Sequence, residues 1–132
     1  MMKLKLLTLI GLLVVAACGN DNPADPLAEF EPEVNNATDS FQLQASDVSD
    51  VGATMQYTWQ NTGSLAAVDH STTTAAGGAG LVIRDADGTV VYDQALAPSL
   101  NEDTSSGTAG MWTITLGLSD YSGTLNFRVQ KK

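Results

Sequence analysis

The sequence is poor in the residues that form disulfides, zinc centres and nucleic-acid surfaces. Its 132 residues include one cysteine and one histidine, so it can form neither an internal disulfide nor a zinc site of four Cys and His ligands. Six basic residues stand against 15 acidic ones, which argues against a nucleic-acid partner, because phosphate binding depends on Lys and Arg. A chain of this length closes one hydrophobic core, which excludes a multidomain enzyme.

The N-terminal segment has the pattern of a secretory signal peptide. Lys3 and Lys5 precede an apolar run at residues 6–15, and two small residues then lead to Cys18. The run is about ten residues long, whereas a membrane-spanning helix needs roughly 20. We therefore expect residues 1–17 to be a removable signal. Without the two lysines, four basic residues remain against 15 acidic ones, a net charge of −11.

The four residues Val15, Ala16, Ala17 and Cys18 resemble the lipobox of bacterial lipoproteins. This resemblance implies that the mature chain starts at Cys18, whose thiol carries diacylglycerol and whose amino group is acylated. Such a lipid would attach the protein to the membrane without a spanning segment. In enterobacteria an aspartate directly after the cysteine favours the inner membrane. Gly19 at this position favours the outer membrane, so we expect the protein in the cell envelope.

Residues 18–39 are expected to form a disordered, acidic tether. Within it, residues 19–37 contain three of the four prolines, five acidic residues and no sustained periodicity, so the segment should remain extended and solvated. The alternative is that its acidic residues act as a surface-export signal. The folded domain is then expected at residues 40–132.

From residue 40 onward, apolar and polar residues alternate, which is the pattern of half-buried β-strands. The alternation is clearest near the C-terminus. After Cys18, no window of ten or more residues shows a sustained helical stripe. The pattern predicts seven strands, at residues 41–45, 53–60, 65–71, 79–84, 89–96, 112–118 and 125–130.

Seven short strands predict an all-β, antiparallel sandwich of two sheets, with a small closed barrel as the alternative. Residues 40–132 resemble bacterial immunoglobulin-like domains, mainly in the runs 109–116 and 122–129, although the usual disulfide is missing. We expect Trp59 and Trp112 to face inward.

Two hairpin turns are expected within this sandwich, at residues 85–88 and at residues 120–123. The second would place Tyr121 in a turn. The first would set Ile83 opposite Val90 and Leu81 opposite Tyr92, with Val82, Val91 and Met111 facing outward.

His70 is the only imidazole base, and it lies between Asp69 and Ser71. Neighbouring residues of a strand point to opposite faces, so Asp69 and Ser71 share one face and His70 takes the other. The three residues therefore cannot form a catalytic triad from one strand. We expect a solvated histidine and no enzymatic activity.

Asp85, Asp87 and Asp93 surround Gly88 and resemble a calcium loop with alternate aspartates. Thr89 occupies the next expected ligand position, and the glutamate of a calcium-binding helix-loop-helix is missing. A simple hairpin loop is the favoured interpretation, so we predict no metal or other cofactor. Two further acidic pairs, Glu102 with Asp103 and Asp47 with Asp50, are weaker candidates.

Three classes of function remain. The first is a lipid-anchored, non-catalytic binding or accessory module of the cell envelope, whose partners are the membrane, through the lipid on Cys18, and an unidentified envelope protein or glycan. The second is a structural subunit of an envelope assembly that docks by strand addition. The third is a small enzyme or inhibitor, or a calcium-binding domain.

Overall fold

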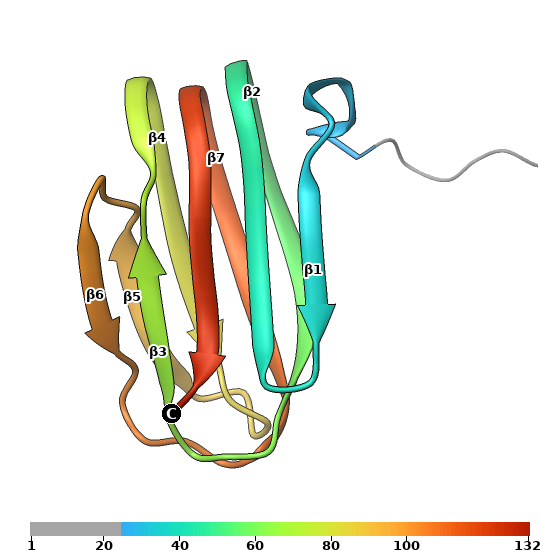
Figure 1. Cartoon of the computed structure of the whole chain (residues 1–132), viewed down its shortest axis with the longest axis vertical. Coiled ribbons are helices and arrows are strands. Elements are labelled where there is room, and N and C mark those ends of the chain that lie inside the picture. Colours follow the sequence, from blue (N-terminus) through green and yellow to red (C-terminus); the bar gives the residue numbers. More distant parts are fainter. Residues whose placement is uncertain (1–24) are drawn as a thin grey trace, which may run out of the picture.

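The computed structural model describes residues 25–132, which form an all-β fold (Figure 1). A short 3-10 helix precedes seven antiparallel strands. This confirms the predicted fold class, although the individual strands differ from those expected. The elements are η2 (Ala28–Phe30), β1 (Glu33–Ala37), β2 (Ser40–Asn61), β3 (Ala66–His70), β4 (Thr73–Arg84), β5 (Val90–Ala95), β6 (Leu100–Asp103) and β7 (Gly110–Lys131).

The sandwich is one sheet folded over on itself. Strands β2 and β7 pair along their whole lengths, from Ser40 opposite Gln130 to Asn61 opposite Gly110, and β4 pairs with the other side of β7. All three strands bend back at the same end of the molecule (Figure 1). Layer A contains β1, the first half of β2, the second half of β7, β3 and β6. Layer B contains the second half of β2, the first half of β7, most of β4, and β5.

The bend lies where the sequence predicts breaks between strands. The expected turn at residues 120–123 is wrong, and so is the expected break between the strands at 41–45 and 53–60, because both segments lie inside continuous strands. The pairing register shifts repeatedly here, as it does at β-bulges. Aspartate and glycine tolerate the left-handed backbone that such bulges require. Residues with positive φ at the bend are Asp47, Asp50, Gly77, Asp120 and Gly123.

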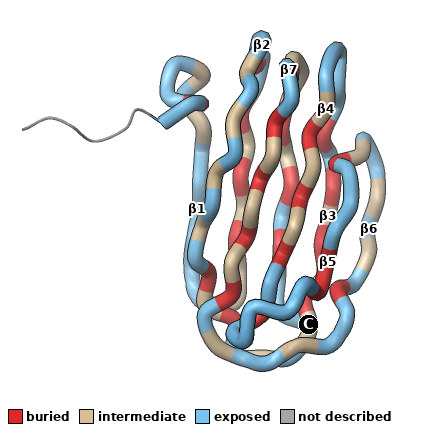
Figure 2. The backbone as a smooth tube through the Cα atoms, turned by 180° about the vertical axis from the view of Figure 1, so that it is seen from behind, coloured by how far each residue is buried: buried red, intermediate tan, exposed pale blue. Residues whose placement is uncertain are grey.

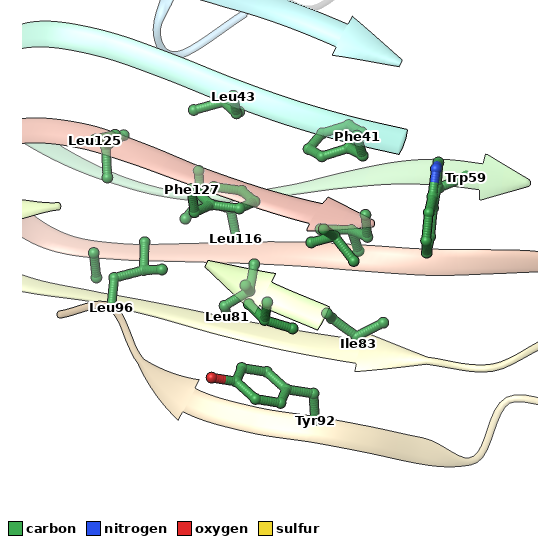
Figure 3. Packing of buried hydrophobic residues seen from close by; sticks show 14 of the residues in the cluster. Phe41, Leu43, Trp59, Leu81, Ile83, Tyr92, Leu96, Leu116, Leu125 and Phe127 are labelled. Atoms are coloured by element: carbon green, nitrogen blue, oxygen red, sulfur yellow. The ribbon is translucent and has the colours of Figure 1, made fainter. Parts of the chain in front are cut away.

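The core lies between the two layers, where apolar side chains from both meet (Figure 3). Buried and less buried positions alternate along the long strands (Figure 2). Trp59 and Trp112 are fully buried, as predicted, and their rings meet edge to face at 5.9 Å. Tyr121, expected in a turn, is also fully buried, and its hydroxyl donates to the carbonyl of Thr73 at 2.7 Å. It is buried because the bend, unlike a hairpin tip, faces the core.

The folded domain begins earlier than the boundary expected at residue 40. Leu27 is fully buried in the core, and β1 pairs with β2 from Glu33 opposite Gln44 to Ala37 opposite Ser40. The expectation of a disordered tether is therefore wrong for residues 25–39. The sequence conceals β1 because every residue of this edge strand is exposed, so that it shows no buried apolar alternation.

The register between β4 and β5 also differs from the expected one. Ile83 pairs with Tyr92 and Leu81 pairs with Gln94, with a register shift next to Arg84. Val91 is the extra residue of this bulge and is buried together with Tyr92, so it does not face outward. Met111 is exposed, as predicted, whereas Val82 is half-buried.

Candidate functional site

A hollow lies on the surface of the molecule at the bend. It has a volume of about 430 Å³ and lies over residues 122–124 of β7, between residues 47–48 of β2 and residues 73–75 of β4. Two hydroxyls in it are fixed by the bulged backbone of β2, since Thr124 accepts from the amide of Asp47 and Ser122 accepts from the amide of Asp50. The polar groups that line the hollow are thus hydroxyls and one carboxylate, and they lie beside the apolar side chains of Val48 and Ala75.

A second hollow, of about 130 Å³, continues the first along β7. Asn126 follows Thr124 on the same face of β7, and Ser71 precedes Thr73 on the neighbouring path of β3 and β4. At its far end the Arg128 guanidinium binds the Asp69 carboxylate at 3.2 Å. We call this surface the polar strip, and it consists of Gln42, Asp47, Asp69, Ser71, Thr73, Ser122, Thr124, Asn126 and Arg128.

The strand period explains why these polar residues gather. Buried Leu125, Phe127 and Val129 alternate with Asn126 and Arg128, so the apolar set points into the core and the polar set points out of layer A. A third hollow, of about 280 Å³, lies across β2 on the same layer. The exposed large hydrophobic residues of the described chain are Val34, Val90 and Met111, none of which belongs to the strip.

His70 belongs to a different, buried network, so the expectation of a solvated histidine is wrong. Its side chain is 1% exposed, and its Nε2 lies 2.7 Å from the hydroxyl of Tyr92. That hydroxyl donates to Glu102 at 2.7 Å, and the amide of Ala97 donates to Nδ1 of His70 at 3.1 Å. The sequence could not reveal this burial, because the partners lie on other strands.

The network determines the protonation state of the imidazole. Nδ1 accepts a hydrogen bond and therefore carries no proton, so Nε2 carries it and donates to Tyr92. Burial lowers the pKa of His70, which outweighs the opposite effects of Glu102 and Asp69. Burial and the bond to Glu102 raise the pKa of the Tyr92 hydroxyl. Both ring nitrogens are occupied, and Ser71 is on the opposite face as predicted, so His70 cannot activate it as a nucleophile.

The three aspartates considered as calcium ligands do not converge. Asp85 is buried, and its Oδ1 accepts from the amides of Asp87 and Thr89 while its Oδ2 accepts from the amide of Thr108. These backbone bonds, led by the one from Thr108, lower the pKa of Asp85. Asp93 is exposed on β5. In residues 25–132, no three His, Cys, Asp or Glu side chains are grouped to hold a metal ion.

The cations of the described chain all interact with neighbouring oxygen atoms. Besides Arg128, Lys131 lies 3.6 Å from Asp39 and Lys132 lies 2.6 Å from Asp103. Arg84 donates to the carbonyl of Gly88. A polyanion would therefore have to displace an existing partner at each cation, which weakens any electrostatic attraction.

No protein-family model matches the chain, and no curated protein matches it either. The resemblances to lipoproteins and to immunoglobulin-like domains stay predictions, and Cys18 lies outside the described residues. Within residues 25–132, no helix has the length and apolar character needed to cross a membrane.

Proposed function

We propose that the chain is a lipid-anchored, non-catalytic module of the bacterial cell envelope that binds a polar partner through the polar strip. The observation that carries the proposal is the pair of neighbouring hollows along β7, whose polar groups are hydroxyls, amides, carboxylates and the Arg128 guanidinium. The strip contains none of the large exposed apolar side chains of the described residues, the kind that usually forms the centre of a protein interface. Its chemistry favours a glycan, whose hydroxyls can both donate to and accept from such side chains.

The non-catalytic role is supported by the state of the reactive groups. His70, the only histidine, is buried and has both ring nitrogens occupied. Both carboxylate oxygens of Asp85 accept hydrogen bonds from backbone amides. Of the two carboxylates in the strip, Asp69 is paired with the Arg128 guanidinium at 3.2 Å.

The proposed lipid on Cys18 would keep the domain close to the membrane. Asp25 is only seven positions after Cys18, so that an extended chain spans at most about 25 Å between them. The described chain begins near the end where β2, β7 and β4 bend (Figure 1). The bend, with its larger hollow, would therefore be the end nearer to the lipid, and Gly19 favours the outer membrane.

The anchor is tested by the mass of the mature N-terminus and by cell fractionation. We expect a signal cleaved before Cys18, an acylated cysteine, and a Cys18→Ser variant that leaves the membrane fraction. An unmodified Cys18 in a membrane-free protein would contradict the anchor.

The binding surface is tested separately in intact cells. A photo-crosslinking amino acid at Asn126 should give adducts that the same group at Thr115 does not give. Thr115 is equally half-buried but lies on the outer face of layer B, which makes it a matched control. Equal crosslinking at both positions would remove the strip as the binding surface.

A second candidate function is a structural subunit of an envelope assembly. It is favoured by a different observation, the unpaired edge of layer B. That edge is independent of the polar strip.

A further inference from the structure

The four edges of the folded sheet are protected unequally. Edge strands usually avoid unwanted pairing by being short or by carrying charge or proline. Strand β1 has five residues and follows Pro32, β6 has four residues including two acids, and β5 contains Asp93 and a bulge. The remaining edge is the second half of β2. Its residues 53–60 contain neither a charge nor a proline.

The backbone of this edge has groups without partners. The carbonyl of Thr58 accepts from the side chain of Asn36, and the carbonyl of Gln60 accepts from the amide of Asp39. Both carbonyls therefore point away from β7. Since the register has no shift between Ala53 and Asn61, the N–H and C=O groups of Thr54 and Gln56 point the same way. Within the described chain, this part of β2 pairs with β7 alone and these four groups have no backbone partner.

Apolar side chains beside this edge are only partly covered. Met55 and Tyr57 point toward the core but are only half-buried, as is Phe30, which packs against the same cluster. Val34 of β1 shares its face with buried Leu43 and is nevertheless 38% exposed. A strand added to β2 would pair with the free backbone groups and would cover this apolar row.

Charge identifies the kind of strand that fits. Asp50 lies at the bend next to the edge, and Asp25 lies near enough to Tyr57 that its charge, together with the larger effect of burial, raises the pKa of that hydroxyl. A second copy of this chain would bring the same acids and its own charge of −9. Like charges across a pairing edge are unfavourable, whereas lysine or arginine would be attracted.

We propose that the outer edge of β2 at residues 53–57 is a strand-addition site for an extended segment of another protein, with alternating apolar residues and flanking lysine or arginine. The proposal depends neither on the lipid at Cys18 nor on the polar strip. It gives the chain a protein-binding edge separate from the surface proposed for a glycan.

The test uses three synthetic peptides and the full chain purified in detergent. The first peptide alternates valine and threonine between pairs of lysines, the second is the same peptide N-methylated at every other residue, and the third has glutamates in place of the lysines. Amide hydrogen exchange at Thr54 and Gln56 is the measurement. The lysine peptide should slow exchange at both amides at least about tenfold, and the other two peptides should not.

Two variants examine the edge from the protein side. Gln56→Pro removes an outward N–H without removing a bond to β7, and an edge position tolerates proline. It should abolish binding of the lysine peptide, whereas Gln56→Thr, which keeps the N–H, should bind as the parent does. The N-methylated peptide keeps the test decisive even if Gln56→Pro unfolds, because it leaves the protein unchanged.

Three outcomes would overturn the proposal. The first is the absence of protection at Thr54 and Gln56, and the second is equal protection by the N-methylated peptide. The third is protection without peptide that grows with protein concentration, which would assign the edge to a second copy of the chain.

Discussion

Acid should destabilise the domain through a single residue, His70. The folded state holds its ring neutral, because the Ala97 amide donates to Nδ1 and the side chain is 1% exposed. Unfolding releases the ring to water, where its pKa returns to about 6.5. Below that pH the unfolded chain binds a proton that the folded chain resists, since burial lowers the folded pKa. The free energy of unfolding must therefore fall as the pH falls below about 6.5.

The size of the effect has an upper limit that can be calculated. One site contributes at most about 1.4 kcal/mol per pH unit between its unfolded and folded pKa values. Lowering the pH from 6.5 to 5 can therefore remove at most about 2 kcal/mol from the 5–15 kcal/mol that is typical of a domain. The range from pH 6.5 to 5 reports mainly on His70, because His70 is the only histidine and the carboxyl groups of an unfolded chain titrate near pH 4. Backbone bonds lower the pKa values of Asp39 and Asp85, so these two residues contribute at still lower pH.

The assay is urea unfolding followed by the fluorescence of Trp59 and Trp112, at several pH values from 7.5 to 5. The parent should lose stability over this range, and a His70→Gln variant, which does not titrate, should show a flat profile. Equal pH dependence in both proteins would refute the reasoning, as would an NMR titration that gives His70 a pKa of 6.5 or higher. Tyr92→Phe should cost about 1–3 kcal/mol at pH 7, because it leaves the buried Nε2–H without its acceptor.

Three further predictions concern the core, the bend and the loop. Trp112→Ala should cost about 3–5 kcal/mol in urea unfolding, whereas Met111→Ala, 51% exposed, should change stability by less than about 0.5 kcal/mol. Gly77→Ala should lower the free energy of unfolding by at least about 3 kcal/mol, since the φ of Gly77 is +71° and a Cβ there would lie 2.1 Å from a backbone oxygen. Gly78→Ala is the control and should destabilise the domain far less, because a Cβ at Gly78 meets nothing within 4 Å. Asp85→Asn should lower the melting temperature, because both carboxylate oxygens of Asp85 accept hydrogen bonds from backbone amides. For the same reason, calcium should leave the melting temperature of the parent unchanged. A rise in that temperature with calcium would contradict the assignment.

The period of two in the sequence predicted parts of β2, β3, β4, β5 and β7 and most of their inward faces, but it missed the short edge strands β1 and β6. Trp59 and Trp112 are both buried because alternation places them with their apolar neighbours, wherever the strands begin and end. The same rule separates Asn126 and Arg128 of the polar strip from the core residues between them. It could not show which strands lie beside each other, so the strip as a continuous surface required the structure.

The errors arose where one residue type serves two structural purposes. Aspartate and glycine tolerate a left-handed backbone, which both a hairpin turn and a β-bulge require. Residues 120–123 therefore carry the signal of a turn, although they bend a continuous strand. For His70, local alternation gave the correct face, but its burial depends on Tyr92 and Ala97, which lie 22 and 27 residues further along the chain.

The two lateral sides of the sandwich are held by different kinds of contact, so they should respond to different perturbations. On one side, the Tyr92 hydroxyl of β5 in layer B bonds to His70 and Glu102 of β3 and β6 in layer A, so polar contacts join the layers. On the other side, Asn36 reaches the carbonyl of Thr58 near one end, while the apolar row beside Thr54 remains half-exposed. A fall in pH should destabilise the first side because that side contains His70. An added strand should bind at the second side because that side contains the unpaired backbone groups. Acid should therefore loosen β5 and β6 without creating or removing the proposed strand-addition site.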